Sequence, residues 1–365
     1  MGFPMKITMI LDYIRITYLF FFYIRKQNLK INEIKRWKKA FIHFSYNMRK
    51  TASDYAKHWR VIEGFVKSDI KLIKKAQGGV KGQAPILISV IFNEIDRIAV
   101  FLEHYRNIGI KKFAIIDNGS TDGTVEYLKR QPDVELFQTM DKFESRIKTG
   151  WINRIISFYG VKYWYLVVDA DELLVWQNVE ESRICDVIRI LKKRKITRAR
   201  ALMIDMYPRE KRWDTDESFQ EVFIKCRYFD YNTYFHRKNE EVYFLGGGPR
   251  KRKLGMDIWL TKYPLFCLKD EEIMASPHAV YPFENEKKPC YLALLHYKFL
   301  TKNDKKRVHE NARNGNYSRG SYEYKMYVRK QALNADYFDF YFEQSTEYQS
   351  SQSLAKIKEI DKIPL

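Results

Sequence analysis

The sequence contains little cysteine and none of the cysteine patterns that mark a small stapled or zinc-bound fold. Among 365 residues there are four cysteines, at positions 185, 226, 267 and 290, and none of them forms a CxxC pair. This scarcity argues against a disulfide framework and against a zinc site built from cysteine pairs. It favours a reducing compartment.

A long apolar run is also missing near the N-terminus. The stretch 16–24 (ITYLFFFYI) is uncharged but short. As a helix it covers roughly 13 Å, less than half of a ~30 Å hydrocarbon core. Extending it backwards includes Arg15 and Asp12, which cost about 2.5–3.5 kcal/mol each at the centre of a membrane helix. We expect this segment to lie on a membrane or on the protein, without spanning a bilayer, and no cleavable signal peptide is visible.

Positive charge, by contrast, is abundant. The chain has 65 Lys+Arg against 45 Asp+Glu, a formal net charge of +20, which favours anionic partners. Nine basic residues fall between 25 and 50, interleaved with an apolar stripe that includes Trp37. We predict that residues 1–80 are a basic amphipathic helical region. It either binds an anionic membrane surface or caps the following domain.

A glycine-rich linker at 78–85 precedes alternating strand and helix patterns. Short apolar runs at 86–92, 112–116, 134–138 and 164–168 predict buried strands, with helical patterns between them. This order predicts an α/β fold with a mostly parallel, doubly wound sheet. Further strand-like runs are 199–206, 221–229, 242–245, 264–268 and 291–299. The tail, 301–365, is predicted to be helical.

Three carboxylates follow the apolar run at 164–168, namely Asp169, Asp171 and Glu172. Their mutual repulsion makes such a cluster costly without a cation. Hard oxygen ligands of this kind suit Mg²⁺ or Mn²⁺ held together with a diphosphate. The alternative interpretation is an acidic turn in which one residue caps the next helix.

Polar residues also follow two earlier strands. Asn93 and Glu94 come after the run at 86–92, and the turn 117–124 (DNGSTDGT) follows the run at 112–116. Such a turn presents backbone N–H groups and a carboxylate to a ligand, and Asp122 can cap the following helix. Ligands of doubly wound sheets bind beyond the carboxyl ends of the strands, which is where these residues fall.

Taken in order, Asn93-Glu94, DNGSTDGT at 117–124 and DADE at 169–172 resemble the signature of glycosyltransferase family 2. The segment 101–105 (FLEHY) is similar to a branch found in bacterial surface-polysaccharide loci. The resemblance covers residue 86 to about residue 299. It implies a GT-A fold over 85–300, a nucleotide-binding α/β sheet with helices on both faces. In that fold 85–176 binds the nucleotide sugar, and 177–300 lies on the acceptor side.

The resemblance also implies roles for single residues. Asp117 would contact the nucleotide base, with Asn93 and Glu94 lining that pocket and Asp122 in the same donor site. Asp169 would lie near the ribose or the metal, and Asp171 would bind the metal that bridges the donor phosphates. A late histidine often completes the metal site of GT-A enzymes; His296 is the first candidate and His278 the second.

Two further elements of such a site are harder to assign. The run 246–253 (GGGPRKRK) allows close backbone approach, and its Arg250 and Arg252 can hold the phosphates of the donor or of a lipid acceptor; the alternative is a solvated basic loop. An inverting transferase also needs a base. The Glu-Asp pair that supplies it in many family members is missing here, which leaves Asp257, Asp205 and His278 as candidates.

We therefore expect a metal-dependent, inverting glycosyltransferase that uses a nucleotide-diphosphate sugar and a glycan or lipid-linked acceptor. It would act in surface-polysaccharide synthesis, in the cytoplasm or at the inner face of the membrane. One alternative is a sugar-1-phosphate nucleotidyltransferase, which needs a glycine-rich loop where 92–94 reads FNE. The other is a non-enzymatic basic membrane- or nucleic-acid-binding protein. No nucleic-acid partner is expected, because RNA-binding and helix-turn-helix patterns are missing.

Overall fold

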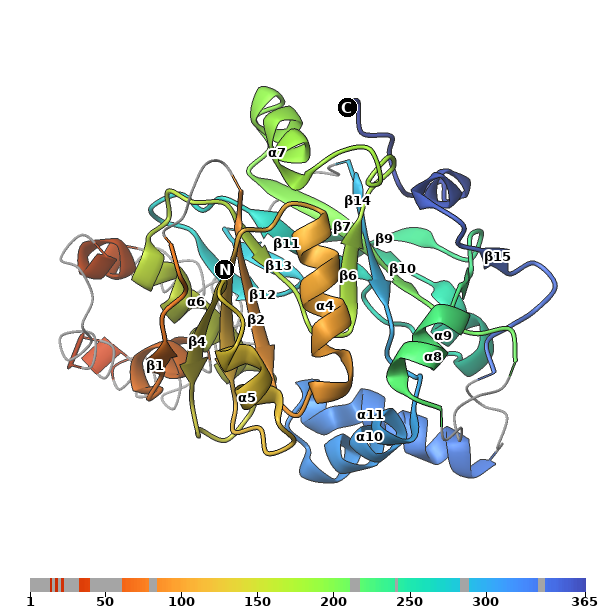
Figure 1. The fold of residues 1–365 in the computed structure, drawn as a ribbon, viewed down its shortest axis with the longest axis horizontal. Helices are drawn as coiled ribbons and strands as arrows, with labels where there is room; N and C mark the ends of the chain where they lie inside the picture. Colours follow the sequence, from red (N-terminus) through yellow and green to blue (C-terminus); the bar gives the residue numbers. More distant parts are fainter. Residues whose placement is uncertain are drawn as a thin grey trace, which may run out of the picture.

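The centre of the molecule is one nine-stranded sheet (Figure 1). The computed structural model describes residues 14, 17–18, 21–22, 33–39, 61–78, 84–210, 217–239, 242–282, 289–333 and 339–365. Across the sheet the strands are β1 (Lys71–Lys74), β4 (Val134–Gln138), β3 (Lys112–Asp117), β2 (Ile86–Ile91), β5 (Tyr165–Val167), β11 (Thr261–Phe266), β7 (Arg198–Asp205), β14 (Leu292–His296) and β6 (Glu172–Val175).

The sheet is mostly parallel. Strands β2, β3, β4, β5, β7 and β14 run in one direction, and β1, β6 and β11 run in the other. The six co-directed strands all end at the same edge of the sheet, called here the carboxyl edge. The sequence predicts that the nucleotide-sugar region ends at position 176. The same sheet continues past this position, because β7, β11 and β14, which follow it in the chain, belong to the sheet together with β6.

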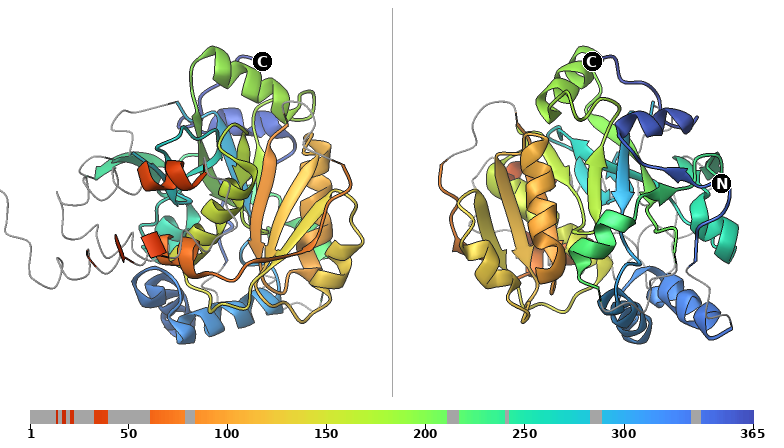
Figure 2. Two further views of the ribbon diagram at one scale, coloured as in Figure 1. Left: turned by 90° about the vertical axis from the view of Figure 1, so that its left-hand side faces the viewer. Right: turned by 45° about the vertical axis from the view of Figure 1, so that its right-hand side comes forward.

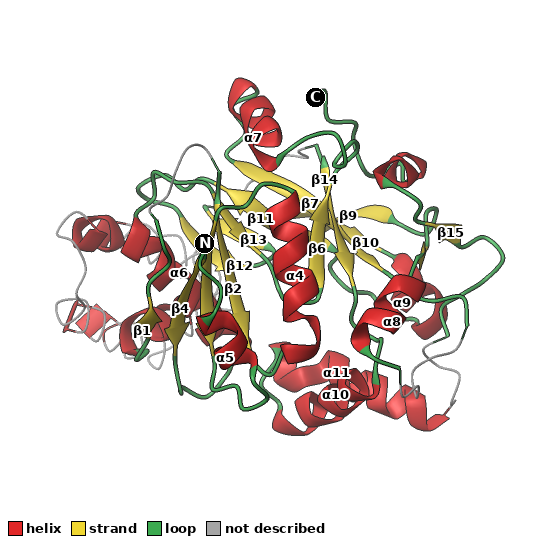
Figure 3. Ribbon diagram, in the orientation of Figure 1, coloured by secondary structure: helices red, strands yellow, loops and turns green. Residues whose placement is uncertain are grey.

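Helices cover both faces of the sheet (Figure 3). Alternate residues of a strand point to opposite faces, so Leu87 and Ile91 of β2 join one core while Ile86 and Ile88 join the other. The first core contains the apolar faces of α4 (Ile95–Asn107), α5 (Thr124–Lys129) and α7 (Ile184–Lys193). The second contains α6 (Ser145–Tyr159). Burial on both faces explains why these strands are continuous apolar runs.

The remaining elements surround the sheet. They are α8 (Phe219–Lys225), β8 (Tyr228–Phe229), the hairpin β9 (Phe235–Asn239) and β10 (Val242–Gly246), α9 (Gly248–Leu254), β12 (Ile273–Ser276), β13 (Ala279–Tyr281), α10 (Lys302–Asn314), α11 (Ser318–Leu333), β15 (Thr346–Glu347) and the 3₁₀ helix η1 (Ser351–Lys356). Helices α10 and α11 lie against the carboxyl edge, at the bottom of Figure 1.

The predicted α/β order is confirmed, with four differences in individual elements. The run 221–229 is mainly helix α8, because Ser218 and Glu221 form a capping box at its start. The run 246–253 ends in helix α9 and is not a loop, with Pro249 in its first turn. Residues 71–74 form strand β1 and not a helix. The tail is helical as far as 333, and beyond 339 it contains only β15 and η1.

Two N-terminal helical segments, 33–39 and 61–67, pack beside α6 (Figure 2, left). Trp37 is buried, stacks on Phe65 at 3.6 Å between ring centroids, and donates a hydrogen bond to Ser157 of α6. Arg36 is buried as well and donates to Ser157 (3.0 Å) and to the carbonyl of Glu272 (3.1 Å). These two segments therefore cap the domain. The rest of the basic stretch, 25–32 and 40–50, lies outside the described residues. Among the described residues no helix has the length and apolarity to cross a bilayer.

Candidate functional site

The carboxyl edge brings together six of the residues selected from the sequence. Asn93 and Glu94 follow β2, Asp117 ends β3, Asp169 follows β5, Asp205 ends β7 and His296 ends β14. The parallel topology accounts for this, since co-directed strands end at one edge. These residues thus lie at one edge of the sheet, as their positions after the strands predict, and what each can do depends on its contacts.

Asp171 lies in the turn that joins β5 to β6, and His296, at the end of β14, faces it. The Nε2 atom of His296 lies 3.4 Å from Oδ2 of Asp171, and its Nδ1 lies 2.7 Å from Oδ1 of Asp205. The backbone holds the turn in place, because the N–H of Tyr297 donates to the carbonyl of Asp171 (2.8 Å). Glu172 pairs with His296 across β6 and β14. Asp171, Glu172 and His296 each offer a ligand atom within 4.8 Å of the others.

These groups shift one another's ionisation. Burial disfavours the charged form of Asp171, but the facing imidazole and nearby cations outweigh it and hold the pKa of this carboxyl well below its usual range. Burial likewise disfavours a charged His296, yet Asp171 and Asp205 raise its pKa above the usual value. For Asp205, Arg250 and His296 overcome burial and lower the pKa. The two carboxylates therefore favour the protonated form of the imidazole.

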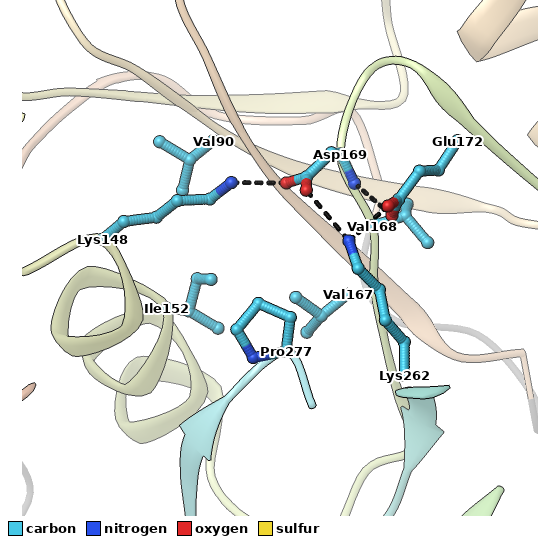
Figure 4. A pocket seen from close by; sticks show the side chains of 9 residues that line it. All are labelled: Val90, Lys148, Ile152, Val167, Val168, Asp169, Glu172, Lys262 and Pro277. Carbon is cyan, nitrogen blue, oxygen red and sulfur yellow. Dashed lines mark hydrogen bonds and ion pairs between the residues drawn. The ribbon is translucent and has the colours of Figure 1, made fainter. Parts of the chain in front are cut away.

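Asp169 lies in a small pocket at the same edge, shown in Figure 4. Lys148 of α6 reaches its Oδ1, and Lys262 of β11 reaches its Oδ2 at 3.1 Å and also contacts Glu172. The two ammonium groups overcome the effect of burial and hold the pKa of Asp169 well below its usual range. The cavity measures about 10 Å³, roughly the space that one water molecule needs. It is smaller than the ~300–1,000 Å³ of typical ligand sites, and both lysines reach into it.

Asp117 shapes the turn that follows it. Its carboxylate is fully buried and accepts N–H groups from Gly119 (3.0 Å) and Ser120 (3.2 Å), and the side-chain amide of Gln138 (3.2 Å). Gly119 has φ +80°, the left-handed region that favours glycine. The nucleotide-base contact implied by the resemblance stays a prediction for this residue.

Asn93 ties the turn after β2 to the turn after β3. Its backbone N–H donates to Oγ of Ser120 and its Oδ1 accepts from the N–H of Thr121, both at 2.8 Å. These bonds hold Asn93 at φ +55°, a conformation uncommon for a residue other than glycine. The two polar turns form one rigid platform at the carboxyl edge.

Asp122 satisfies the first amides of two helices. Its Oδ2 accepts from Ile95, the first residue of α4, and its Oδ1 accepts from Thr124, the first residue of α5, both at 3.0 Å. Such amides have no partner within their own helix. Burial opposes ionisation, but the hydrogen bonds from Thr124 and Ile95 lower the pKa of Asp122. Its contacts therefore position α4 and α5 on the platform.

Glu94 connects the platform to the C-terminal helices. Its Oε2 lies 3.1 Å from Nε of Arg97 and 2.9 Å from Nη1 of Arg307 in α10. Arg97 also pairs with Asp304 of α10 and donates to the carbonyl of Tyr297 (3.3 Å). Burial, only partly offset by the two arginines, raises the pKa of Glu94. This cluster holds α10 over the carboxyl edge.

The two arginines of the glycine-rich run have internal partners, which differs from the phosphate-binding prediction. Arg250 is buried and its Nε lies 2.7 Å from Oδ2 of Asp205. Arg252 pairs with the fully buried Asp230 at 2.8 Å and lies 3.8 Å from the ring centroid of Phe342. The positive charges of both side chains are thus paired with carboxylates of the protein itself.

The three candidates for the base lie in different surroundings. Asp205 has both carboxylate oxygens occupied, by His296 and Arg250. Asp257 pairs with Arg237 of β9. His278 contacts the carbonyl of Thr261 through Nδ1 (2.7 Å), and burial followed by the nearby charge of Lys262 lowers its pKa to about 4. Within the described residues, Asp257 has no ion pair with the residues that surround Asp171 and His296.

Sequence reasoning missed four charged residues of the site: Lys148, Lys262, Lys298 and Glu323. Lys298 Nζ lies 3.0 Å from Oε1 of Glu323 on α11. Only Lys298 carried a usable signal, since it lies two residues after His296. The others come from segments whose place in the sheet or over its edge could not be read from local pattern.

The chain matches no protein-family model and no curated protein. A functional interpretation therefore depends on the ordered motifs and on the geometry described above.

Proposed function

We propose that the protein is a metal-dependent glycosyltransferase of the GT-A type that transfers a sugar from a nucleotide-diphosphate donor to a hydroxyl group. The observation that carries the proposal is the cluster of Asp171, Glu172 and His296 at the carboxyl edge, with ligand atoms within 4.8 Å of one another. The platform of Asn93 and Asp117 lies along the same edge, where α/β sheets bind nucleotides.

The donor set fits a divalent cation. Two carboxylates and one imidazole suit Mn²⁺ and are acceptable to Mg²⁺, which prefers oxygen ligands alone. Asp205 accepts from Nδ1 of His296 and leaves Nε2 for a cation, the arrangement in which a carboxylate orients a histidine ligand. When bound, the metal would neutralise the diphosphate leaving group. Asp169, held by two lysines, would lie beside that diphosphate.

The residues of the chain have separate tasks in this proposal. The turn 117–124 and Asn93 would hold the nucleoside, and Lys148 and Lys262 supply positive charge next to the phosphates. The acceptor would approach from the side of α10 and α11, which lie over the carboxyl edge. A nucleotidyltransferase is disfavoured, because Asn93 is fixed in a rigid turn where that class needs a glycine-rich loop.

An anionic membrane surface is the proposed location. Ile14, Tyr18 and Phe22 recur at helical spacing and are 58%, 65% and 42% exposed, and the following residues are strongly basic. Apolar side chains beside basic residues bind anionic bilayers. Co-sedimentation with vesicles containing phosphatidylserine should exceed that with phosphatidylcholine alone, and Tyr18→Ser should reduce it. Equal binding to both vesicles would remove this part of the proposal.

The donor site is tested by thermal stability with UDP, GDP, CDP and dTDP, each with and without Mn²⁺. A bound nucleotide raises the melting temperature by mass action. One nucleotide should stabilise the wild type only when Mn²⁺ is present, and Asp171→Ala should abolish the effect. Asp270→Ala, at an exposed turn residue, is the matched control and should keep it. A wild type that responds to none of the nucleotides would refute the proposal.

A further inference from the structure

The contacts of Glu323 leave one of its carboxylate oxygens available at the site. Its Oε1 accepts from Lys298 Nζ (3.0 Å), from Arg250 Nη1 (3.1 Å) and from the hydroxyl of Tyr327. Within the part of the chain that the structure describes, Oε2 has no hydrogen-bond or ion-pair partner, and the side chain is 33% exposed. One oxygen of the carboxylate is thus held by three donors, and the side chain as a whole is partly exposed.

Glu323 is joined to the proposed metal cluster by an unbroken series of contacts. Arg250 binds Glu323 through Nη1 and Asp205 through Nε, and Asp205 binds His296. Lys298, two residues after His296, donates from Nζ to Oε1 of Glu323 at 3.0 Å. Glu323 therefore lies on the α11 side of the space above the carboxyl edge.

The neighbouring residue on α11 gives the same location. Burial, and after it the charges of Glu323 and Asp171, raise the pKa of Tyr324. The ring of Tyr324 lies 4.7 Å from Nζ of Lys298 and 4.7 Å from the ring of Tyr317, between centroids. Two aromatic rings and the carboxylate of Glu323 thus gather beside Lys298.

We propose that Glu323 is the catalytic base of the transfer; this rests on the proposed function. The acceptor oxygen forms a bond to the anomeric carbon while the bond from that carbon to the phosphate oxygen breaks. The electron pair of the broken bond leaves with the nucleoside diphosphate. The proton of the acceptor hydroxyl moves to Oε2 of Glu323.

The surroundings of Glu323 suit a late proton transfer. Burial opposes ionisation, but Lys298 and Arg250 hold the pKa of Glu323 well below its usual range, so the carboxylate is ionised throughout the neutral range. A free hydroxyl is too weak an acid to give up its proton to such a group. Once its oxygen has begun to bond to the anomeric carbon, the hydroxyl becomes strongly acidic, and Glu323 then accepts the proton.

The test uses UDP-glucose, UDP-galactose, UDP-N-acetylglucosamine and GDP-mannose with Mn²⁺, and water as the acceptor. Glu323→Gln keeps the size of the side chain and removes its basicity. It should lower kcat for hydrolysis by about 10²–10⁴-fold, the usual contribution of a general base, with the KM for the donor and the nucleotide-induced thermal shift unchanged. Glu310→Gln, on α10 and 46% exposed, is the control and should hydrolyse the donor at the wild-type rate.

A second variant guards against a folding defect. Glu323→Ala opens space beside Lys298, and added formate should restore part of its lost hydrolysis without restoring any other variant. Hydrolysis by Glu323→Gln at the wild-type rate would overturn the assignment of Glu323 as the base. A variant that loses both hydrolysis and the nucleotide-induced thermal shift would overturn it as well, because the loss of activity would then come from lost donor binding. If the wild type neither binds nor hydrolyses any of these donors, the proposed function is refuted. This result comes from the wild type alone, so it is distinct from a failure of the Glu323 assignment.

Discussion

Asp205 orients His296, since Oδ1 of the carboxylate lies 2.7 Å from Nδ1 of the imidazole and leaves Nε2 facing Asp171 at 3.4 Å. The two strands that carry them, β7 and β14, are parallel neighbours, and Asp205 stands opposite His296 in their register. The last residues of two adjacent strands therefore form the imidazole–carboxylate pair. Arg250 holds the second oxygen of Asp205 and completes the support.

The first prediction concerns this support. Asp205→Asn should weaken Mn²⁺ binding about 10–100-fold, the usual effect of removing a carboxylate that orients a metal-bound histidine. Calorimetric titration of wild type and variant with Mn²⁺ measures the change. Asp270→Asn, in an exposed turn, is the control with the same substitution. Unaltered affinity in Asp205→Asn would mean that β14 alone sets the position of the ring.

A second prediction concerns the attachment of α10 to the carboxyl edge. Arg97 is 4% exposed and lies between Glu94 and Asp304. Arg97→Met should lower the free energy of unfolding by about 3–5 kcal/mol, because it leaves two buried carboxylates without their shared cation. Arg189→Met removes an exposed ion pair with Asp186 and should cost about 0–1 kcal/mol. Urea unfolding compares them; equal losses would argue that α10 does not close over Arg97.

Much of the fold, and the gathering of the polar strand-end residues at one edge, could be predicted, because both follow from local pattern. A strand buried on both faces must be an apolar run, and 86–92 and 164–168 are such runs. Their co-directed ends then bring Asn93 and Asp169 to one edge, and His296 follows by the same rule from the later run at 291–299. These predictions needed only the position of each strand in the sequence and the shared direction of the strands.

The pairing of charges could not be predicted in this way. Lys262 reaches Asp169 because β11 lies between β5 and β7, an order that no local pattern encodes. Arg250 lies in a helix, where three glycines and a basic run suggested a loop, and it pairs with Asp205 and Glu323, which are distant in the sequence. Glu323 is positioned by the packing of α11 over the edge, which depends on contacts with distant segments. The local sequence therefore predicted at which edge of the sheet charged side chains gather. Tertiary contacts decide which of these side chains pair with one another and which can still bind a ligand.

A third prediction uses the pH dependence of stability. His104 is largely buried on α4 and contacts the carbonyl of Leu174 at 2.9 Å; burial lowers its pKa to about 4. A histidine whose folded pKa lies below its unfolded value of about 6.5 contributes fully above pH 6.5 and loses that contribution as the pH falls towards 4. His104→Gln keeps a donor for Leu174 and removes the titration.

Between pH 7 and pH 5, the stability advantage of the wild type over His104→Gln should shrink by about 2 kcal/mol. Urea unfolding at several pH values measures it, and carboxylates that titrate in both proteins cancel in the difference. An advantage that stays constant over this range would mean that His104 is solvated well enough to ionise normally.

The fourth prediction concerns the close contact between α6 and the helical segment 61–67. A Cβ atom at Gly150 would lie 2.4 Å from the carbonyl oxygen of Val61 and 2.4 Å from the amide nitrogen of Phe65. Both are backbone atoms, so the contact cannot be relieved by turning a side chain. In a free helix Gly→Ala stabilises by roughly 0.5–1 kcal/mol. Here Gly150→Ala should destabilise by about 1–3 kcal/mol through overpacking, as chemical unfolding would record. The sign of the change in the free energy of unfolding is decisive. A gain in stability would mean that 61–67 does not pack against α6 at this distance. The N-terminal helices would then be held to the domain mainly by Arg36 and Trp37.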